Sequence, residues 1–284
     1  MALRLPNWVR LAIVLSALMQ LMFGATLLFD PGRIAELWPW PLPPLTARLL
    51  GASTLVSVPM AFLIVWINRF AVAAIPLVMM LTYRVLQLLA GVIHHEKFAA
   101  DSLVTWNYFG GGLLMAAMFA YPLLAARAGR LLPTRSNAPL AEAMPWRIQS
   151  PARASLALLG AVYLALGLAF LMLGAAAKPF WFDAAGLTPL TARLFASPLT
   201  GLGLGIILVS RASDWREIMV PAIGMVTIGI FGTLSLLLDR ASFAPQSAAA
   251  WLVAATPPIL LLVGVALLLS RRMVEPGTKK RRSR

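Results

Sequence analysis

Eight long apolar stretches, separated by short charged or proline-rich segments, constrain this chain of 284 residues more than any other feature. A helix needs about 20 apolar residues to cross the hydrocarbon core of a bilayer. None of the stretches contains an aspartate or a glutamate. They cover residues 11–29, 47–67, 71–92, 103–126, 154–174, 190–210, 218–238 and 249–270, each to within a few positions. The sequence therefore predicts an all-α integral membrane protein with eight transmembrane helices.

Composition agrees with this fold class. Hydrophobic residues make up 60% of the chain and charged residues 12%, whereas soluble domains carry about 25% charged residues. The net charge of +14 would suggest nucleic-acid binding in a soluble protein. In a membrane protein, the same excess of lysine and arginine marks the cytoplasmic side of the bilayer. The distribution of the basic residues along the chain decides between these interpretations.

Basic residues gather on one side of the predicted topology. With the N-terminus in the cytoplasm, the cytoplasmic segments hold 17 of the 24 lysines and arginines. The opposite side holds six, which a similar number of acidic residues balances, and Arg84 lies within a span. This asymmetry predicts that both termini are cytoplasmic and that the chain is a multi-pass protein of the cell membrane, of the bacterial inner-membrane type. No nucleic-acid partner is expected.

The sequence repeats itself at a fixed distance. The run Pro-Leu-Thr-Ala-Arg occurs at 44–48 and again at 189–193, an offset of 145 residues. The same offset aligns Pro76 with Pro221 and Trp106 with Trp251 without a gap. We therefore expect two tandem four-helix repeats in the same orientation, because each repeat crosses the membrane an even number of times. The expected divisions are repeat 1 at 1–127, a cytoplasmic linker at 128–152, repeat 2 at 153–272 and a basic cytoplasmic tail at 273–284.

The arginines of the repeated run, Arg48 and Arg193, are predicted to act as structural clamps. Each falls in the first turn of a span, where the helix dipole disfavours a cation and a partner is needed. The nearby acidic residues are Asp30 and Glu36 for Arg48, and Asp183 for Arg193. Since the same arginine stands in both halves, a shared structural role is favoured over ligand binding.

Arg84 is different, because it lies near the middle of the third span and has no counterpart in the second half. Its neighbours Tyr83 and Gln87 are polar, and Gln20 of the first span could join them. An intramembrane arginine costs at least about 3 kcal/mol on insertion scales unless it faces a partner or a wet cavity. Two interpretations stay open: backbone carbonyls and these side chains satisfy Arg84 internally, or the cluster binds an anionic group such as a phosphate, a carboxylate or a lipid head.

Neither a cofactor nor a metal site is expected. The chain has no cysteine, and its two histidines, His94 and His95, are adjacent, so they point about 100° apart on a helix. Glycines such as Gly160, Gly167 and Gly203 lack the sequence context of a phosphate loop and are interpreted as close-packing positions between helices. The pair Pro257-Pro258 is expected to kink the eighth span.

The sequence favours a non-enzymatic membrane protein that binds or translocates a small anionic or amphiphilic, lipid-like molecule near Arg84. The alternative is a structural or assembly subunit of a membrane complex. An intramembrane enzyme ranks last, because the spans offer no cysteine, no metal-binding spacing and no buried carboxylate as a base. Expected partners are anionic membrane lipids at the basic tail, and either another membrane protein or a second copy of the chain.

Overall fold

The computed structural model describes residues 3–35, 38, 40, 42–131, 150–182 and 187–270, and the helices of this part account for the whole fold. Its α-helices are α1 (Asn7–Phe29), α2 (Pro31–Ala35), α3 (Pro44–Leu55), α4 (Ser57–Ile67), α5 (Phe70–Ile93), α6 (Leu103–Trp106), α7 (Gly112–Arg127), α8 (Ser150–Leu173), α9 (Pro189–Arg211), α10 (Trp215–Leu238), α11 (Ala248–Ala254) and α12 (Thr256–Leu269). A π-helix, η2 (Asn107–Gly111), joins α6 to α7, and short 3-10 helices, η1 (His95–Lys97) and η3 (Gly174–Phe180), follow α5 and α8. No β-strand occurs among these residues, which confirms the expected all-α class.

Seven helical segments are long and apolar enough to cross a membrane, with α3 and α4 forming one segment and α6 to α7 another. The count reaches eight if the bent pair α11 and α12 is one span. These two helices meet at 41°. The expected kink therefore occurs, because Pro257 and Pro258 cannot donate the backbone hydrogen bonds that would continue α11.

The expected linker and tail fall mostly outside the described residues. Of the linker, residues 132–149 lie outside, as do residues 271–284 with the whole basic tail. The fifth span begins earlier than the apolar pattern indicated, since α8 starts at Ser150 rather than near residue 154. A polar stretch can extend an apolar helix beyond the region that must be buried in hydrocarbon.

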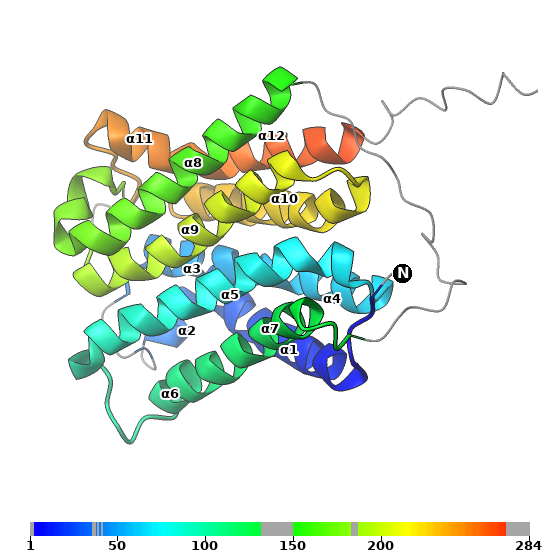
Figure 1. Cartoon of the computed structure of the whole chain (residues 1–284). Helices are drawn as coiled ribbons and strands as arrows, with labels where there is room; N and C mark the ends of the chain where they lie inside the picture. Colours follow the sequence, from blue (N-terminus) through cyan, green and yellow to red (C-terminus); the bar gives the residue numbers. More distant parts are fainter. Residues whose placement is uncertain are drawn as a thin grey trace, which may run out of the picture.

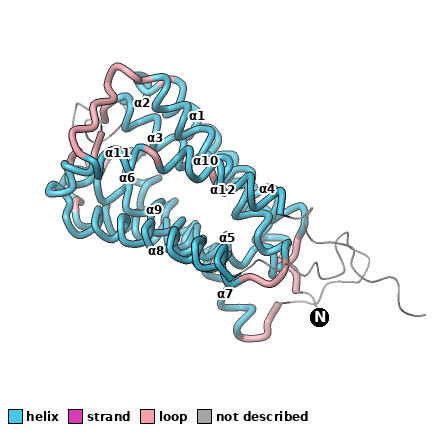
Figure 2. The backbone as a smooth tube through the Cα atoms, turned by 90° about the horizontal axis from the view of Figure 1, so that it is seen from above, coloured by secondary structure: helices cyan, strands magenta, loops and turns pink. Residues whose placement is uncertain are grey.

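The spans form two layers. One layer contains α1, α3 with α4, α10 and α12, and the other contains α7, α5, α9 and α8. Seen from above, α5, α8 and α9 lie on one side of the molecule and α1, α3, α10 and α12 on the other (Figure 2). Each half of the chain thus contributes one helical hairpin to each layer. The chain begins, and α12 ends, at the same end of the bundle (Figure 1).

Glycines bring α8 and α9 into close contact. A Cβ atom at Gly160 would lie 2.8 Å from the carbonyl oxygen of Gly203, and one at Gly167 would lie 2.6 Å from the backbone nitrogen of Thr200. No side chain fits at these distances. The expected close-packing role of these glycines agrees with this geometry, which is common where helices meet in lipid.

Large apolar side chains cover the outside of the bundle. Met22 on α1, Leu113 on α7, Met172 on α8 and Leu262 on α12 are between 65% and 77% exposed. These helices lie at the edges of the two layers. Water-soluble monomers rarely expose apolar surface on this scale, so the outer surface suits contact with lipid.

Candidate ligand site at Arg84

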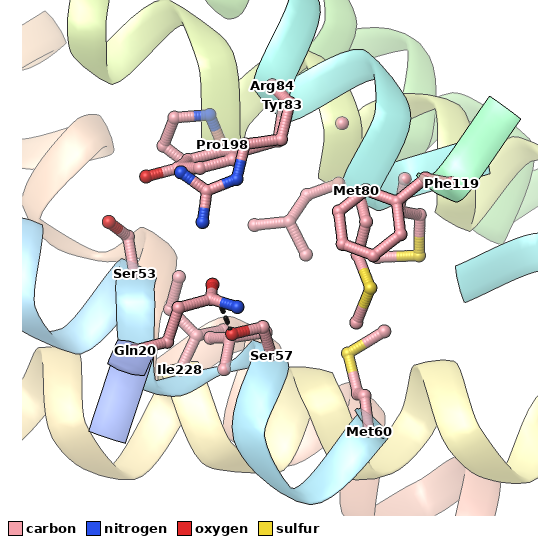
Figure 3. Close-up of a pocket in the computed structure, with 14 residues that line it drawn as sticks. Gln20, Ser53, Ser57, Met60, Met80, Tyr83, Arg84, Phe119, Pro198 and Ile228 are labelled. Carbon is pink, nitrogen blue, oxygen red and sulfur yellow. Dashed lines mark hydrogen bonds between the residues drawn. The ribbon is translucent and has the colours of Figure 1, made fainter. Parts of the chain in front are cut away.

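Arg84 lies on α5 and extends into the space between the two layers. Its side chain comes from the middle of the span Phe70–Ile93 and is only 8% exposed. The guanidinium group points toward Gln20 of α1, across the interior from α5 (Figure 3). The charged group is therefore directed into the protein rather than toward lipid or the ends of the bundle.

The guanidinium of Arg84 is poorly satisfied by the described residues. Its Nη1 donates one hydrogen bond of 2.7 Å to Oε1 of Gln87, and its Cζ lies 5.1 Å from the ring centre of Tyr83. No described carboxylate forms an ion pair with it. A guanidinium has five N–H donors, so four of them have no acceptor among the described residues.

Gln20 is held by serines rather than by Arg84. Its Nε2 donates to Oγ of Ser16 over 2.9 Å, and its Oε1 accepts a hydrogen bond of 2.6 Å from Ser57. All four residues predicted to form the site, namely Gln20, Tyr83, Arg84 and Gln87, nevertheless line one cavity together. The structure brings the predicted set to one place and bonds only Arg84 to Gln87.

Two cavities meet at Arg84. The first, here called the central cavity, has about 520 Å³ of empty volume and lies between the layers (Figure 3). The second, called the polar cavity, has about 680 Å³ and lies among α1, α5 and the η2 region. Gln20, Tyr83 and Arg84 line both cavities. Volumes of this order are typical of small-molecule sites.

The polar cavity includes residues that the sequence did not single out. Tyr108 donates a hydrogen bond of 2.5 Å to the backbone carbonyl of Gln87, and Asn107 lines the same space. Both belong to the π-helix η2, a distortion that often accompanies functional sites. The available sequence signal was an asparagine next to three consecutive glycines within an apolar stretch.

Arg48 clamps helix ends. Its Nε pairs with Oδ2 of Asp239 over 2.5 Å, and its Nη1 donates to the backbone carbonyl of Leu28. The expected pairing with Asp30 is therefore not what the structure shows, since Asp30 instead accepts a bond of 3.4 Å from the backbone N–H of Arg33. Asp30 is well placed for the first turn of α2, whereas Asp239 ends a helix packed on α3. The other expected acidic partners, Glu36 and Asp183, lie outside the described residues.

Arg193 makes the corresponding contacts in the second half. Its Nε donates to the carbonyl of Leu171 at the end of α8, over 3.2 Å, and its Nη1 lies 2.5 Å from Nε2 of His94. Since arginine only donates, Nε2 of His94 must accept, which leaves the ring proton on Nδ1, 3.6 Å from the carboxylate of Glu96. Burial lowers the pKa of His94 and the charge of Arg193 lowers it further.

The turn that carries both histidines offers no metal site in the described part of the chain. There, no three histidine, cysteine, aspartate or glutamate side chains lie close enough together to hold a metal ion. The arrangement at His94 instead serves the contact with Arg193.

Comparison with protein-family models, with curated proteins and with solved structures finds no match for this chain. The geometry around Arg84 is therefore what supports a function.

Proposed function

We propose that this protein binds a small anionic or amphiphilic molecule within the membrane, and that Arg84 holds the negative charge of that molecule. One observation carries the proposal: a guanidinium that is 8% exposed faces two cavities and has one hydrogen bond to the described residues. A buried charge without a partner is strongly destabilising. An anion in the cavity would supply both the countercharge and the missing acceptors.

The chemistry of the site suits a carboxylate or a phosphate. Such groups accept two parallel hydrogen bonds from one guanidinium, which gives both energy and orientation. The side-chain amide of Asn107 and Nε2 of Gln87 also border the polar cavity and make no hydrogen bond to a described residue. They provide further donors beside Arg84.

The alternative of a structural subunit is less well supported. In that case Arg84 would be satisfied in place by helix carbonyls, as Arg48 and Arg193 are by Leu28 and Leu171. The described residues provide no carbonyl contact to Arg84. The contrast between these three arginines favours a binding role for Arg84 and a clamping role for the other two.

We further propose that the chain consists of two four-span repeats. The support comes from helix boundaries: α3 and α9 begin 145 residues apart, as do α5 and α10, and α6 and α11. The two clamps also obey the offset, because His94 and Asp239 are 145 residues apart, like Arg48 and Arg193. The basic residues of the connecting segments favour a cell-membrane location with both termini in the cytoplasm.

The test is equilibrium binding of dodecanoate, with dodecanol as an uncharged probe, to the full chain in zwitterionic nanodiscs. Wild-type protein should bind dodecanoate more tightly than dodecanol. Arg84→Gln should weaken dodecanoate binding by about 10- to 100-fold, because a hydrogen bond to a charged group contributes about 1.5–3 kcal/mol. Dodecanol binding should change little.

Arg240→Gln is the control, since Arg240 is exposed at the end of α10 and its replacement removes the same charge. It should bind dodecanoate as the wild type does. Unchanged dodecanoate affinity in an Arg84→Gln protein that elutes and melts like the wild type would refute the proposed function.

A further inference from the structure

A third cavity continues the row that begins at Arg84. This space, called the apolar cavity, has about 570 Å³ of empty volume and lies between α3, α8, α9, α10 and the α11–α12 pair. It shares Ser53, Pro198, Leu202 and Ile228 with the central cavity. The central cavity in turn shares Arg84 with the polar cavity. The three cavities therefore adjoin in series between the two layers.

The polar groups of the apolar cavity are already engaged. Tyr163 donates to the carbonyl of Thr256 over 3.1 Å, and the hydroxyl of Thr256 donates to the carbonyl of Val253. The hydroxyl of Ser53 donates to the carbonyl of Leu50 over 2.8 Å. The rest of the lining is aromatic and aliphatic, including Trp181, Phe182 and Phe195. This end of the row offers a ligand only apolar contacts.

The polar and apolar cavities occupy equivalent places in the two halves. An offset of 145 residues converts Tyr83, Tyr108 and Met115 of the polar cavity into Ile228, Val253 and Leu260 of the apolar cavity. It also converts Gln87 into Gly232, which lines the apolar cavity, and Arg84 into Gly229. The two halves thus differ in a consistent way: one end of the row is charged and polar, and the other has lost these groups.

From this gradient we infer that the ligand is a single-chain anionic amphiphile, whose head lies at Arg84 in the polar cavity and whose hydrocarbon chain runs through the central cavity into the apolar cavity. The inference rests on the proposed function and adds the chemical class and orientation of the ligand. A chainless anion would leave two apolar cavities empty, and a neutral hydrocarbon would leave Arg84 without its countercharge. An amphiphile satisfies both ends.

Chain length tests the inference with Ser53→Phe. Ser53 lines both the central and the apolar cavity, so a phenyl ring there blocks the passage between them. Hexadecanoate binding should weaken by about tenfold or more, while butanoate binding stays within about twofold of the wild type. Comparison with the wild type at each length removes the contribution of partitioning into the nanodisc. Ser155→Phe is the matched control, because Ser155 is exposed on α8, and it should change neither affinity.

Photocrosslinking of the wild-type chain gives a second measurement that needs no variant. Hexadecanoate with a diazirine at its terminal carbon should label Trp181, Phe182 or Phe195, and a diazirine next to its carboxylate should label residues of the polar cavity. Terminal labelling of the outer surface only, or equal weakening of both chain lengths by Ser53→Phe, would overturn the inferred chain path. Loss of hexadecanoate and butanoate binding in Arg84→Gln alongside such a result would leave the proposed function standing. Insensitivity of both to Arg84→Gln would overturn both proposals.

Discussion

At the scale of single residues, two equivalent arginines have chemically different partners. Arg48 forms an ion pair with Asp239, whereas Arg193 donates to the neutral ring of His94. Both contacts join the start of one span to the end of a span from the other half of the chain. Only the second contact depends on a group that titrates near neutral pH. One of the two clamps is therefore sensitive to acid in a way that the other is not.

We expect the thermal stability of the wild type to fall by a few degrees between pH 7.5 and pH 5. The groups facing His94 are Arg193 and Lys97, which oppose its protonation, and Glu96, which favours it. In the unfolded chain histidine takes up its proton near pH 6.5, whereas the lowered pKa of folded His94 delays uptake to lower pH. Stability is therefore complete above pH 6.5 and declines as pH falls below it.

The measurement is the melting temperature of the full chain in detergent as a function of pH. His94→Asn keeps an uncharged acceptor for Arg193 and should flatten the pH dependence. His95→Asn, which changes the exposed neighbouring histidine, should retain the dependence of the wild type. Identical slopes for His94→Asn and the wild type would show that another group is responsible.

At the scale of helices, the fourth span of each half is irregular at the same place. The π-helix η2 covers Asn107–Gly111, and the break between α11 and α12 falls at Ala255, which lies in the equivalent range 252–256. The first distortion borders the polar cavity and the second borders the apolar cavity. An irregular backbone within a span is tolerated where it is buried or lines a cavity. These distortions thus widen the space between the layers at both ends of the row.

Replacing glycines with alanine should separate packed helix faces from free ones. Gly203→Ala is expected to destabilise the protein by about 1–3 kcal/mol, because the added Cβ would meet Gly160 and the backbone of Leu164 on α8. Gly110→Ala should be neutral or stabilising, since nothing lies within 4 Å of a Cβ at that position. Thermal unfolding in detergent measures both. A Gly203→Ala protein as stable as the wild type would contradict the close approach of α8 and α9.

The sequence predicted the helices well and their partners poorly. Span positions follow from local composition, because each span must hide its own backbone polar groups from lipid. The association of Tyr83, Arg84 and Gln87 also follows from helix spacing. The ion pair of Arg48 with Asp239 joins residues 191 positions apart, so nearby Asp30 was the natural and wrong choice. The cavities were beyond prediction too, since their walls come from both layers.

At the scale of the whole molecule, the two halves interlock across two interfaces of opposite design. A Cβ atom at Gly205 on α9 would lie 2.6 Å from Cγ of Met79 on α5. At the other interface, one at Gly224 on α10 would lie 2.5 Å from Sδ of Met60 on α4. Under the offset of 145 residues, Met79 corresponds to Gly224 and Met60 to Gly205. Each interface thus pairs one methionine with one glycine, in opposite order.

This pairing predicts rescue by exchange. Gly205→Met alone should strongly reduce the melting temperature, because two methionines would compete for the space of one. Combining it with Met79→Gly should recover most of the loss, since the exchanged pair reproduces the order found at Met60 and Gly224. The remaining deficit should be about 1 kcal/mol, the usual cost of glycine in a helix. A double variant no more stable than Gly205→Met alone would argue against complementary packing.

The layered arrangement has a consequence for the order in which the protein becomes functional during its synthesis. The wall of the central cavity opposite Arg84 includes Pro198, Leu202 and Ile228, which belong to α9 and α10. When the ribosome has completed the first four spans, Arg84 is already in place but the helices that enclose it do not yet exist. A nascent chain therefore carries an unshielded intramembrane charge until about residue 228 has been inserted, and ligand capture can begin only after that point.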